Sequence, residues 1–332
     1  MIPVFNGAQT IEPVVDAALS VFAEQPELAD LRSGGRLEVI LVNDGSSDDS
    51  EAVCRHLAAR HSGVVRFLQL SRNFGEHPAV MAGLHETRGR YAIVLDDDGQ
   101  HPPQEAVRLW RAIRERGCDV VYGRYREKRH HWFRNIGSRL NGAAATWLLR
   151  KPRHLYLSSF KAISSFVVRE VTRYEGPFPY IDGLIFQVTD RIEQIDVEHG
   201  PRQAGRSGYT FRKLVRLWMN MFLGFSTAPL RAAVMLGFGT SAFSALLLLA
   251  VILDKLFVNP QVPVGIPTVL IAIALFAGLQ MFLLGMLGEY IGRIVLTQNG
   301  QPQSIVRYRI APRASSTNPD LDPDAQPEDS HA

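Results

Sequence analysis

Three consecutive carboxylates, Asp96, Asp97 and Asp98, follow directly after an apolar run in the sequence VLDDDGQHPP, residues 94–103. Like charges at neighbouring positions repel each other, and a carboxylate close to a core is costly unless it has a partner. Either water solvates these acids on a turn, or a cation binds them. Hard oxygen ligands suit Mg²⁺ or Mn²⁺, and such ions usually bridge to substrate phosphates. A metal held there would neutralise the charge that develops on a departing diphosphate.

Two more polar residues, Asn6 and Asp44, also follow directly after apolar, strand-like runs. Strand and helix patterns alternate through the first half of the chain, which predicts an α/β fold with a mostly parallel sheet covered on both faces. Ligands bind such sheets beyond the carboxyl ends of the strands, so these polar residues are expected to share one site. The expected strands are 1–5, 37–42, 64–70, 91–95 and 119–123, and the expected helices are 10–22, one that ends at 58, 77–87 and one from 102–103 to 116.

The composition narrows the class of protein. The 332 residues carry a formal net charge of only +3, which gives no general electrostatic case for nucleic-acid binding. The two cysteines, Cys54 and Cys118, fit no metal or redox spacing, so we expect a reduced, cytosol-facing chain. The N-terminus shows no signal peptide. Only four residues precede Phe5, and a true start upstream of Met1 would explain so short a first strand.

Two long uncharged runs follow in the second half, and they predict transmembrane spans at about 232–254 and 266–288. Buried core helices are the alternative, but two such runs in succession favour a transmembrane hairpin. Lys and Arg residues precede the first span and follow the second, whereas the loop between them holds one Asp and one Lys. The positive-inside rule therefore places both ends in the cytoplasm, as in a multi-pass protein of the inner (plasma) membrane.

The segment before the first span, residues 208–231, has the pattern of an amphipathic helix. Leu214, Trp218 and Phe222 recur at helical spacing, and Arg212 and Lys213 lie toward another side. Such a helix is typical of the membrane interface, although a core helix of the soluble part is the alternative. The Pro-, Ser- and Asp-rich end of the chain predicts disorder from about residue 311.

Six motifs carry a resemblance to a known family. They are PVFNG, VNDGSSDDS, SRNFGEHPAVMAGL, VLDDDGQHPP, RQAGRSGYTFRKL and LGEYIGRI, in this order over roughly residues 1–300. In these motifs the chain resembles family 2 glycosyltransferases. More narrowly, it resembles the membrane-anchored polyprenyl-phosphate group, which includes dolichyl-phosphate mannose synthase, undecaprenyl-phosphate glucosyltransferases and the formamido-arabinose transferase of lipid A modification.

This resemblance implies a glycosyltransferase A fold, with a Rossmann-like sheet. It implies inverting transfer of a sugar from a nucleotide-diphosphate sugar to undecaprenyl phosphate or a related polyprenyl phosphate, with Mg²⁺ or Mn²⁺, for envelope glycan or lipopolysaccharide modification. Membrane lipid is a further partner, and a homotetramer is possible by the same resemblance. The expected parts are a cytoplasmic catalytic domain (1–207), interfacial helices (208–231), a transmembrane hairpin (232–290) and a cytoplasmic tail (291–332).

The resemblance also implies roles for particular residues. Asp44 would contact the nucleotide base, Asp98 would bind the metal, and Asp96 would position the ribose or the metal. Asp97 occupies the middle position of the D-x-D motif, where a small residue is common, and is expected to point away as a spectator although it lies within the donor-binding motif. The remaining donor-binding candidates are Pro3, Phe5, Asn6, Asn73 and His77; for His77 a helix-capping or packing role is the alternative.

Phosphate contacts are implied for the R-x-x-G-x-S-x-Y motif. Arg202 is the expected phosphate clamp because its guanidinium binds phosphate in a fork. Arg206, Ser207 and Tyr209 would contact the diphosphate or the lipid phosphate. The alternative is a basic loop that contacts anionic lipid headgroups.

Two positions depart from the family pattern. Gly7 stands where Glu usually follows Asn, so a base or ribose contact would be lost. An Asp proposed as the catalytic base usually lies several residues before a Phe-Arg pair; here Lys161 replaces the Arg, and His154 or Leu155 falls where the Asp would be. A phosphate acceptor is mostly a dianion at neutral pH and needs positioning more than a base, so catalysis survives this loss, with His154 as a weak candidate to orient the phosphate.

Two rival functions stay open. A processive polysaccharide synthase would carry a Q-x-x-R-W motif and more spans, and neither is present. A catalytically silent scaffold of the same fold is favoured by Gly7 and the missing base, and disfavoured by the intact Asp96, Asp98 and Arg202. The sequence does not reveal which sugar is transferred.

Overall fold

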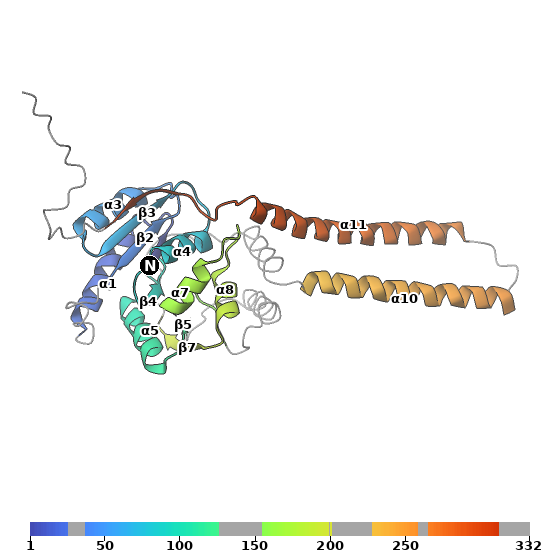
Figure 1. The fold of residues 1–332 in the computed structure, drawn as a ribbon, viewed down its shortest axis with the longest axis horizontal. Coiled ribbons are helices and arrows are strands. Elements are labelled where there is room, and N and C mark those ends of the chain that lie inside the picture. The colour runs from blue at the N-terminus through green and yellow to red at the C-terminus, as the bar shows by residue number, and fades with distance from the viewer. Residues whose placement is uncertain (26–36, 126–154, 199, 201–227, 258–264, 312–332) are drawn as a thin grey trace, which may run out of the picture.

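The computed structural model describes residues 1–25, 37–125, 155–198, 200, 228–257 and 265–311. Within these ranges the chain forms an α/β domain and two long helices that project from it (Figure 1). The strands are β1 (Ile2–Val4), β2 (Val39–Asn43), β3 (Val65–Leu70), β4 (Tyr91–Val94), β5 (Val120–Tyr125), β6 (Lys161–Ser164), β7 (Ile192–Val197) and β8 (Val306–Ile310). The helices are α1 (Ile11–Glu24), α3 (Ser50–Arg60), α4 (Glu76–His85), α5 (Pro103–Arg116), α7 (Ser165–Thr172), α8 (Ile181–Val188), α10 (Ala228–Phe257) and α11 (Ile266–Gln298). The five strands and four helices expected in the first 125 residues are confirmed, within a few residues at their ends.

The strands form two four-stranded sheets, in the orders β1-β2-β3-β8 and β4-β6-β5-β7. Hydrogen bonds at Met1 join them, because its amino group donates to Ile93 O (2.7 Å) and its carbonyl accepts from Leu95 N (3.0 Å). β1 and β4 therefore lie side by side, and their carboxyl ends reach the same edge.

The prediction of a mostly parallel sheet is wrong for half of the pairings. Among the described residues, β1-β2, β2-β3 and β5-β7 are parallel, whereas β3-β8, β4-β6 and β5-β6 are antiparallel. β6 and β8 each begin beside the carboxyl end of a neighbouring strand, so they must run in the opposite direction.

Two hydrophobic cores cover the two faces of the sheet. In β2, which is buried throughout, Val39 and Leu41 pack on the side of α1, α3 and α5, and Ile40 and Val42 pack on the side of α4, α7 and α8. Strands buried on both faces are continuously apolar, and the first polar side chain therefore marks the end of the strand. This is why the polar residues after β1, β2 and β4 gather at one edge.

The end of the chain returns to this sheet. β8 lies antiparallel to β3 with Val306 opposite Leu70, and Ser71 N donates to Ile305 O (2.8 Å). The last turns of α11 also contact the domain, where the Arg293 guanidinium lies 5.2 Å from the centre of the Phe178 ring. The carboxyl end of α11 is thus fixed near the edge of the sheet at which β3 ends.

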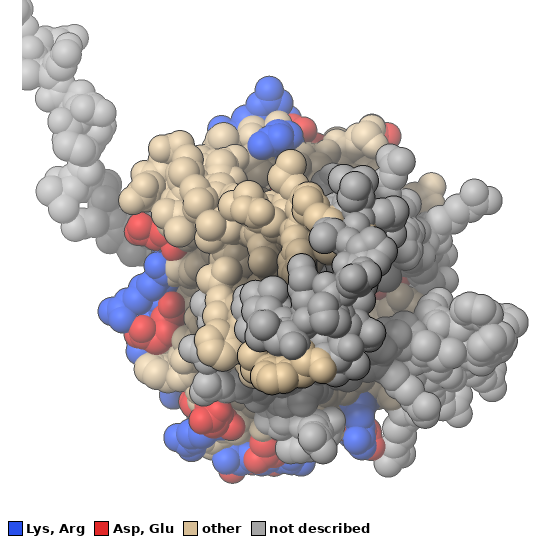
Figure 2. Space-filling model, turned by 90° about the vertical axis from the view of Figure 1, so that its right-hand side faces the viewer, with Lys and Arg blue, Asp and Glu red and all other residues tan. Residues whose placement is uncertain are grey.

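The predicted spans fall on α10 and α11, which lie side by side in Figure 1. Among the described residues, one segment is long and apolar enough to cross a membrane: Phe276–Gln298, in α11, with a mean hydropathy of 1.4. None of the residues in its most apolar stretch is buried. Figure 2 views the molecule along these helices: uncharged described residues lie toward the centre, and charged residues lie around the rim. A crossing by α10, and therefore the hairpin, stays a prediction.

Candidate active site

The loops after β1, β2 and β4 meet at one edge of the sheet. Asn6 N donates to Ser46 Oγ (2.9 Å), which links the first loop to the second. Phe5 N donates to Asp97 Oδ2 (2.9 Å), which links the first loop to the third. The structure therefore brings together the polar residues that the sequence groups in one site.

Asp44 is the buried carboxylate of the second loop. Its two oxygens accept hydrogen bonds from Phe74 N (2.7 Å) and Gly75 N (2.8 Å). Burial raises the pKa of Asp44 to about 6, and these two backbone N–H groups oppose the rise. The next residue, Gly45, has φ +61°, and a Cβ there would overlap the Arg72 carbonyl carbon, so only glycine lets the loops after β2 and β3 pack this closely.

The first loop exposes the Phe5 ring, and the side-chain amide of Asn6 bonds to the second loop. Phe5 is 46% exposed at the end of β1, whereas Pro3 lies inside the strand opposite Val42. Asn6 adopts a left-handed conformation (φ 55°), which asparagine tolerates better than most residues. Its Oδ1 accepts from Ser47 N (2.9 Å) and Ser47 Oγ (3.2 Å). Asn6 therefore holds two loops together, and Phe5 is the residue of this motif that offers a surface to a ligand.

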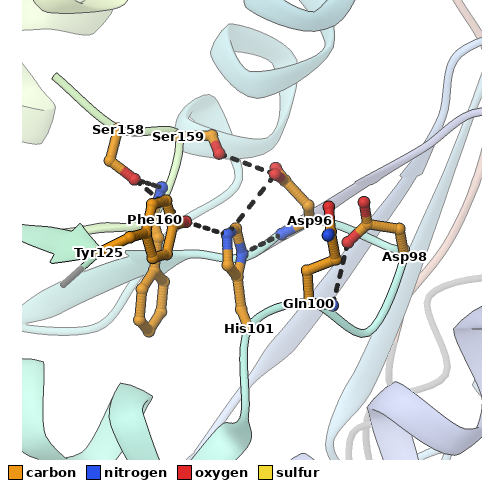
Figure 3. Close-up of polar contacts among 8 residues, drawn as sticks. All are labelled: Asp96, Asp98, Gln100, His101, Tyr125, Ser158, Ser159 and Phe160. Carbon is orange, nitrogen blue, oxygen red and sulfur yellow. Dashed lines mark hydrogen bonds and ion pairs between the residues drawn. The ribbon is translucent and has the colours of Figure 1, made fainter. Parts of the chain in front are cut away.

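Asp96 and Asp98 diverge within the third loop (Figure 3). Asp96 Oδ2 accepts from Ser159 Oγ (2.7 Å) and lies 3.7 Å from His101 Nε2. Asp98 Oδ1 accepts from the backbone N–H of Gln100 (3.1 Å). Burial, and then the nearby Glu76, Asp98 and Asp97 carboxylates, raise the pKa of Asp96 to about 7, although the Ser159 hydrogen bond lowers it.

Asp97 does not point away from the other loops, contrary to what was expected, and a part in donor binding stays a prediction. Its carboxylate turns toward the first loop and accepts the Phe5 N–H. The reason is visible at Gly7, where the missing side chain leaves room for it.

His101 is a site residue that the sequence analysis missed. Its Nδ1 accepts from the backbone N–H of Asp96 (3.1 Å), so the proton of the neutral ring lies on Nε2, which contacts the Tyr125 hydroxyl. The ring is 3% exposed and stacks on Phe160, with 4.7 Å between ring centres. His101 thus orients Asp96 from both its backbone and its carboxylate side. Its position directly after Asp96–Gln100 in the sequence could have marked it as a candidate site residue.

The carboxylates of the loop after β4 could bind a divalent cation, but they would supply only some of its ligands. Among the described residues no three His, Cys, Asp or Glu side chains converge on one point. Mg²⁺ commonly takes one or two carboxylates and completes its shell with water and substrate phosphates. Asp98, with help from Asp96, fits that pattern, which means that the donor diphosphate would complete the site.

Comparisons with known proteins agree with this geometry. Residues 1–171 match the family described as glycosyl transferase family 2. The chain belongs to family 2 of the glycosyltransferases. The predicted resemblance is therefore confirmed, and the α/β domain is glycosyltransferase A-like.

Among the relatives of this glycosyltransferase is the undecaprenyl-phosphate 4-deoxy-4-formamido-L-arabinose transferase of Edwardsiella ictaluri, 32% identical over 92% of this chain and 96% of that protein. The protein of the same name from Proteus mirabilis is 29% identical over 97% of this chain and 96% of its own length. Among solved structures, glucosyl-3-phosphoglycerate synthase from Mycobacterium tuberculosis, in complex with Mn²⁺, UDP-glucose and phosphoglyceric acid, is 18% identical over 67% of this chain and 77% of that chain, with a TM-score of 0.47.

The motif after β3 lies beside the site of this glycosyltransferase. Asn73 is exposed in the loop that follows β3, and His77 lies in the first turn of α4 with its ring against Tyr180 (4.9 Å between ring centres). Burial lowers the pKa of His77, and therefore favours its neutral form. The neighbouring Glu76, which the sequence analysis did not select, acts on Asp96 through its charge.

One of the two positions where the missing catalytic base would fall is apolar in this glycosyltransferase, and the other, His154, lies outside the described residues. Leu155 is 3% exposed and belongs to the core on the α4 side of the sheet. Lys161, in place of the usual Arg, is buried and forms an ion pair with Asp182, which also accepts from the Tyr122 hydroxyl (2.8 Å). Lys161 therefore has a structural partner inside the domain.

Five predicted residues lie outside the described part of the chain: His154, Arg202, Arg206, Ser207 and Tyr209. The nearest described residue to the R-x-x-G-x-S-x-Y motif is Gly200, whose N–H donates to Gln100 O (3.0 Å). The chain thus enters this motif directly beside the Asp96–Gln100 loop.

Proposed function

We propose that this family 2 glycosyltransferase transfers a sugar from a nucleoside-diphosphate donor to undecaprenyl phosphate or a related polyprenyl phosphate, at the cytoplasmic face of the inner membrane. The names of the two relatives support this acceptor, because their similarity extends over more than nine-tenths of the chain. The product would serve envelope glycan or lipopolysaccharide modification.

One observation carries the proposal: an exposed apolar helix is attached to the edge of the sheet that holds the site. β8 begins beside the carboxyl end of β3, and only residues 299–305 separate it from the end of α11. Gln303 also donates to Tyr174 O, near the Arg293–Phe178 contact. A membrane around α11 would therefore lie on the side of the domain where β3 ends, and a lipid phosphate at headgroup depth would face the donor site.

On the donor side, Asp98 and Asp96 would hold Mg²⁺ or Mn²⁺ together with the diphosphate. The ion would neutralise charge on the leaving nucleoside diphosphate. Phe5 would pack on the base, and Asp44 keeps the loops after β2 and β3 in place for the nucleotide through its two backbone hydrogen bonds. Ser159 and His101 fix the orientation of Asp96.

On the acceptor side, the nucleophile would be a phosphate oxygen. This oxygen forms a bond to the anomeric carbon while the bond from that carbon to the diphosphate oxygen breaks, and the configuration inverts. A phosphate monoester has a second pKa of about 6, so it needs no general base at neutral pH. Leu155, one of the two positions where the base would fall, is buried and apolar, which agrees with such an acceptor. Arg202 and its neighbours would bind phosphate, and a two-span anchor would set the depth.

The test is transfer of label to lipid. The purified full chain in detergent, with Mn²⁺, is incubated with undecaprenyl phosphate and a panel of radiolabelled nucleotide sugars. We expect label in the lipid phase with one donor and none with undecaprenol, which lacks the phosphate. Label in polymer would point to a synthase. The absence of turnover with every donor, in a protein that still binds Mn²⁺ and nucleotide, would contradict the proposal.

A further inference from the structure

Gly7 and Asp97 compete for one small space between the first and third loops. Asp97 Oδ2 accepts the Phe5 N–H at 2.9 Å, and its carboxyl group lies against the Gly7 Cα. A Cβ at residue 7 would overlap Oδ2 and lie 3.1 Å from the Asp97 Cγ. Gly7 is itself buried. A side chain at residue 7 and the present position of the Asp97 carboxylate therefore exclude each other, and one of them would have to move.

The sequence departs from the family pattern at these same two positions. The resemblance implies Glu at position 7 and a small residue at position 97, whereas this chain has Gly7 and Asp97. The structure links the two positions, because a side chain at residue 7 would displace the Asp97 carboxylate from its present place. We interpret the pair as one exchange, in which the carboxylate moves from the first loop to the third.

We propose that Asp97 contacts the nucleoside of the donor and accepts hydrogen bonds from its ribose hydroxyls or its base N–H. This inference rests on the proposed function. The carboxylate is only partly exposed, and its hydrogen bond to Phe5 N fixes it beside the exposed Phe5 ring, the apolar surface available to a base. A carboxylate has about four lone-pair positions, so an oxygen that accepts one N–H keeps capacity for a hydroxyl or an imide.

Asp97 would act on affinity for the donor and not on the displacement itself. Its neighbours Asp96 and Asp98 project to other partners, Ser159 and the Gln100 backbone (Figure 3). Loss of Asp97 should therefore raise KM for the donor and leave kcat nearly unchanged.

The test exchanges the two residues. Affinities of the full chain in detergent are measured for UDP and GDP with Mn²⁺, and the tighter ligand is used for all variants. We expect Asp97→Ala to weaken binding about tenfold, the loss of one charge-assisted hydrogen bond. Gly7→Glu alone should weaken binding at least as much. The double variant G7E/D97A should recover binding to within about threefold of the natural protein.

The double variant G7A/D97A is the matched control, because it fills position 7 without a carboxylate. It should remain weak, and equal binding by G7A/D97A and G7E/D97A would overturn the inference. Thermal melts provide a second measurement: Gly7→Ala should lower the melting temperature, and Asp97→Ala should remove that loss. Additive losses would show that the two positions do not share one space.

The readout separates this inference from the proposed function. Normal nucleotide binding without a lipid product would refute the acceptor and leave the exchange intact. If the natural protein binds neither diphosphate, the donor assignment fails, and the inference fails with it.

Discussion

The loop after β2 (residues 43–50) and the loop after β4 (residues 95–102) each bring a carboxylate with a raised pKa to the same edge of the sheet. They stabilise it differently. Both oxygens of Asp44 accept backbone N–H groups, from Phe74 and Gly75. Asp96 accepts one hydroxyl, from Ser159, and is surrounded by the charges of Glu76, Asp97 and Asp98.

Asp44 is thus fixed in place by two backbone hydrogen bonds and keeps lone pairs for a ligand, and its contact with the nucleotide base stays a prediction. In the loop after β4, the carboxylates of Asp96, Asp97 and Asp98 lie close together, and protons or a cation relieve such a cluster. This agrees with the metal site proposed above for the third loop.

The largest expected effect is at Asp98. Asp98→Ala should lower metal-dependent turnover by about 10²–10³-fold, the usual cost of losing one group that stabilises developing charge. The fold should remain intact, because Asp98 is partly exposed and the hydrogen bond that it accepts from Gln100 N lies within its own loop. Initial rates and a thermal melt check both statements.

Glu115→Ala is the matched control, because it removes an exposed carboxylate of α5. It should leave turnover unchanged. Full activity in Asp98→Ala, or undiminished transfer in excess chelator, would contradict the metal assignment.

The position of both loops at one edge of the sheet could be predicted from the sequence. β1 to β4 are apolar runs that end in polar turns, so the rule of ligands at strand ends correctly grouped Asn6, Asp44 and Asp96–Asp98. β6, β7 and β8 were missed. β6 has only four residues, and β8 pairs with a strand more than 230 residues earlier, a register that no local pattern encodes.

Side-chain directions could not be predicted in the same way. The adjacent residues Asp96, Asp97 and Asp98 have three different partners. Asp96 accepts from Ser159, just before β6, Asp97 accepts from Phe5 N in the first loop, and Asp98 accepts from Gln100 N in its own loop. Those partners come from distant parts of the chain, and the small volume of Gly7 decides one of them. His101 was passed over because its role depends on Phe160 and Tyr125, which only the fold brings beside it.

The next largest effects are expected for Asp→Asn substitutions at Asp96 and Asp44, measured as melting temperatures at pH 8 in the presence of a chelator. Asp96 has a folded pKa of about 7, above the ordinary value of 3.8, so the folded state binds more protons between these values and its stability falls as pH rises through this range. Asp96→Asn should therefore raise the melting temperature at pH 8 and flatten its decline between pH 5 and 8. The folded pKa of Asp44, about 6, is also raised, so Asp44→Asn should flatten the decline at lower pH, between about pH 4 and 6. Because a carboxamide oxygen cannot serve two N–H groups as well as a carboxylate can, Asp44→Asn should raise the melting temperature at pH 8 less than Asp96→Asn does.

A larger gain in Asp96→Asn than in Asp44→Asn would support the distinction, and an equal gain in the two variants would break it. Addition of Mn²⁺ at pH 8 should stabilise the natural protein more than Asp96→Asn, since the ion replaces the protons that relieve the charge. A melt across pH 5–8, with and without Mn²⁺, measures all of these effects.

The smallest expected effect is at Ser159, whose hydroxyl acts on the charge of Asp96 in the third loop. The hydroxyl donates to Asp96 Oδ2 and lowers the pKa of Asp96, so Ser159→Ala should raise that pKa further. A hydrogen bond to a charged group contributes about 1.5 kcal/mol or more, which corresponds to roughly one pH unit. The acid limb of the pH–rate profile should therefore move to higher pH by that amount, while the rate above pH 8 changes by less than about threefold.

Ser158→Ala is the control, because Ser158 bonds to Phe160 N and Tyr125 and not to Asp96. A uniform loss of rate at all pH values in Ser159→Ala would show that the hydroxyl positions Asp96 without setting its ionisation.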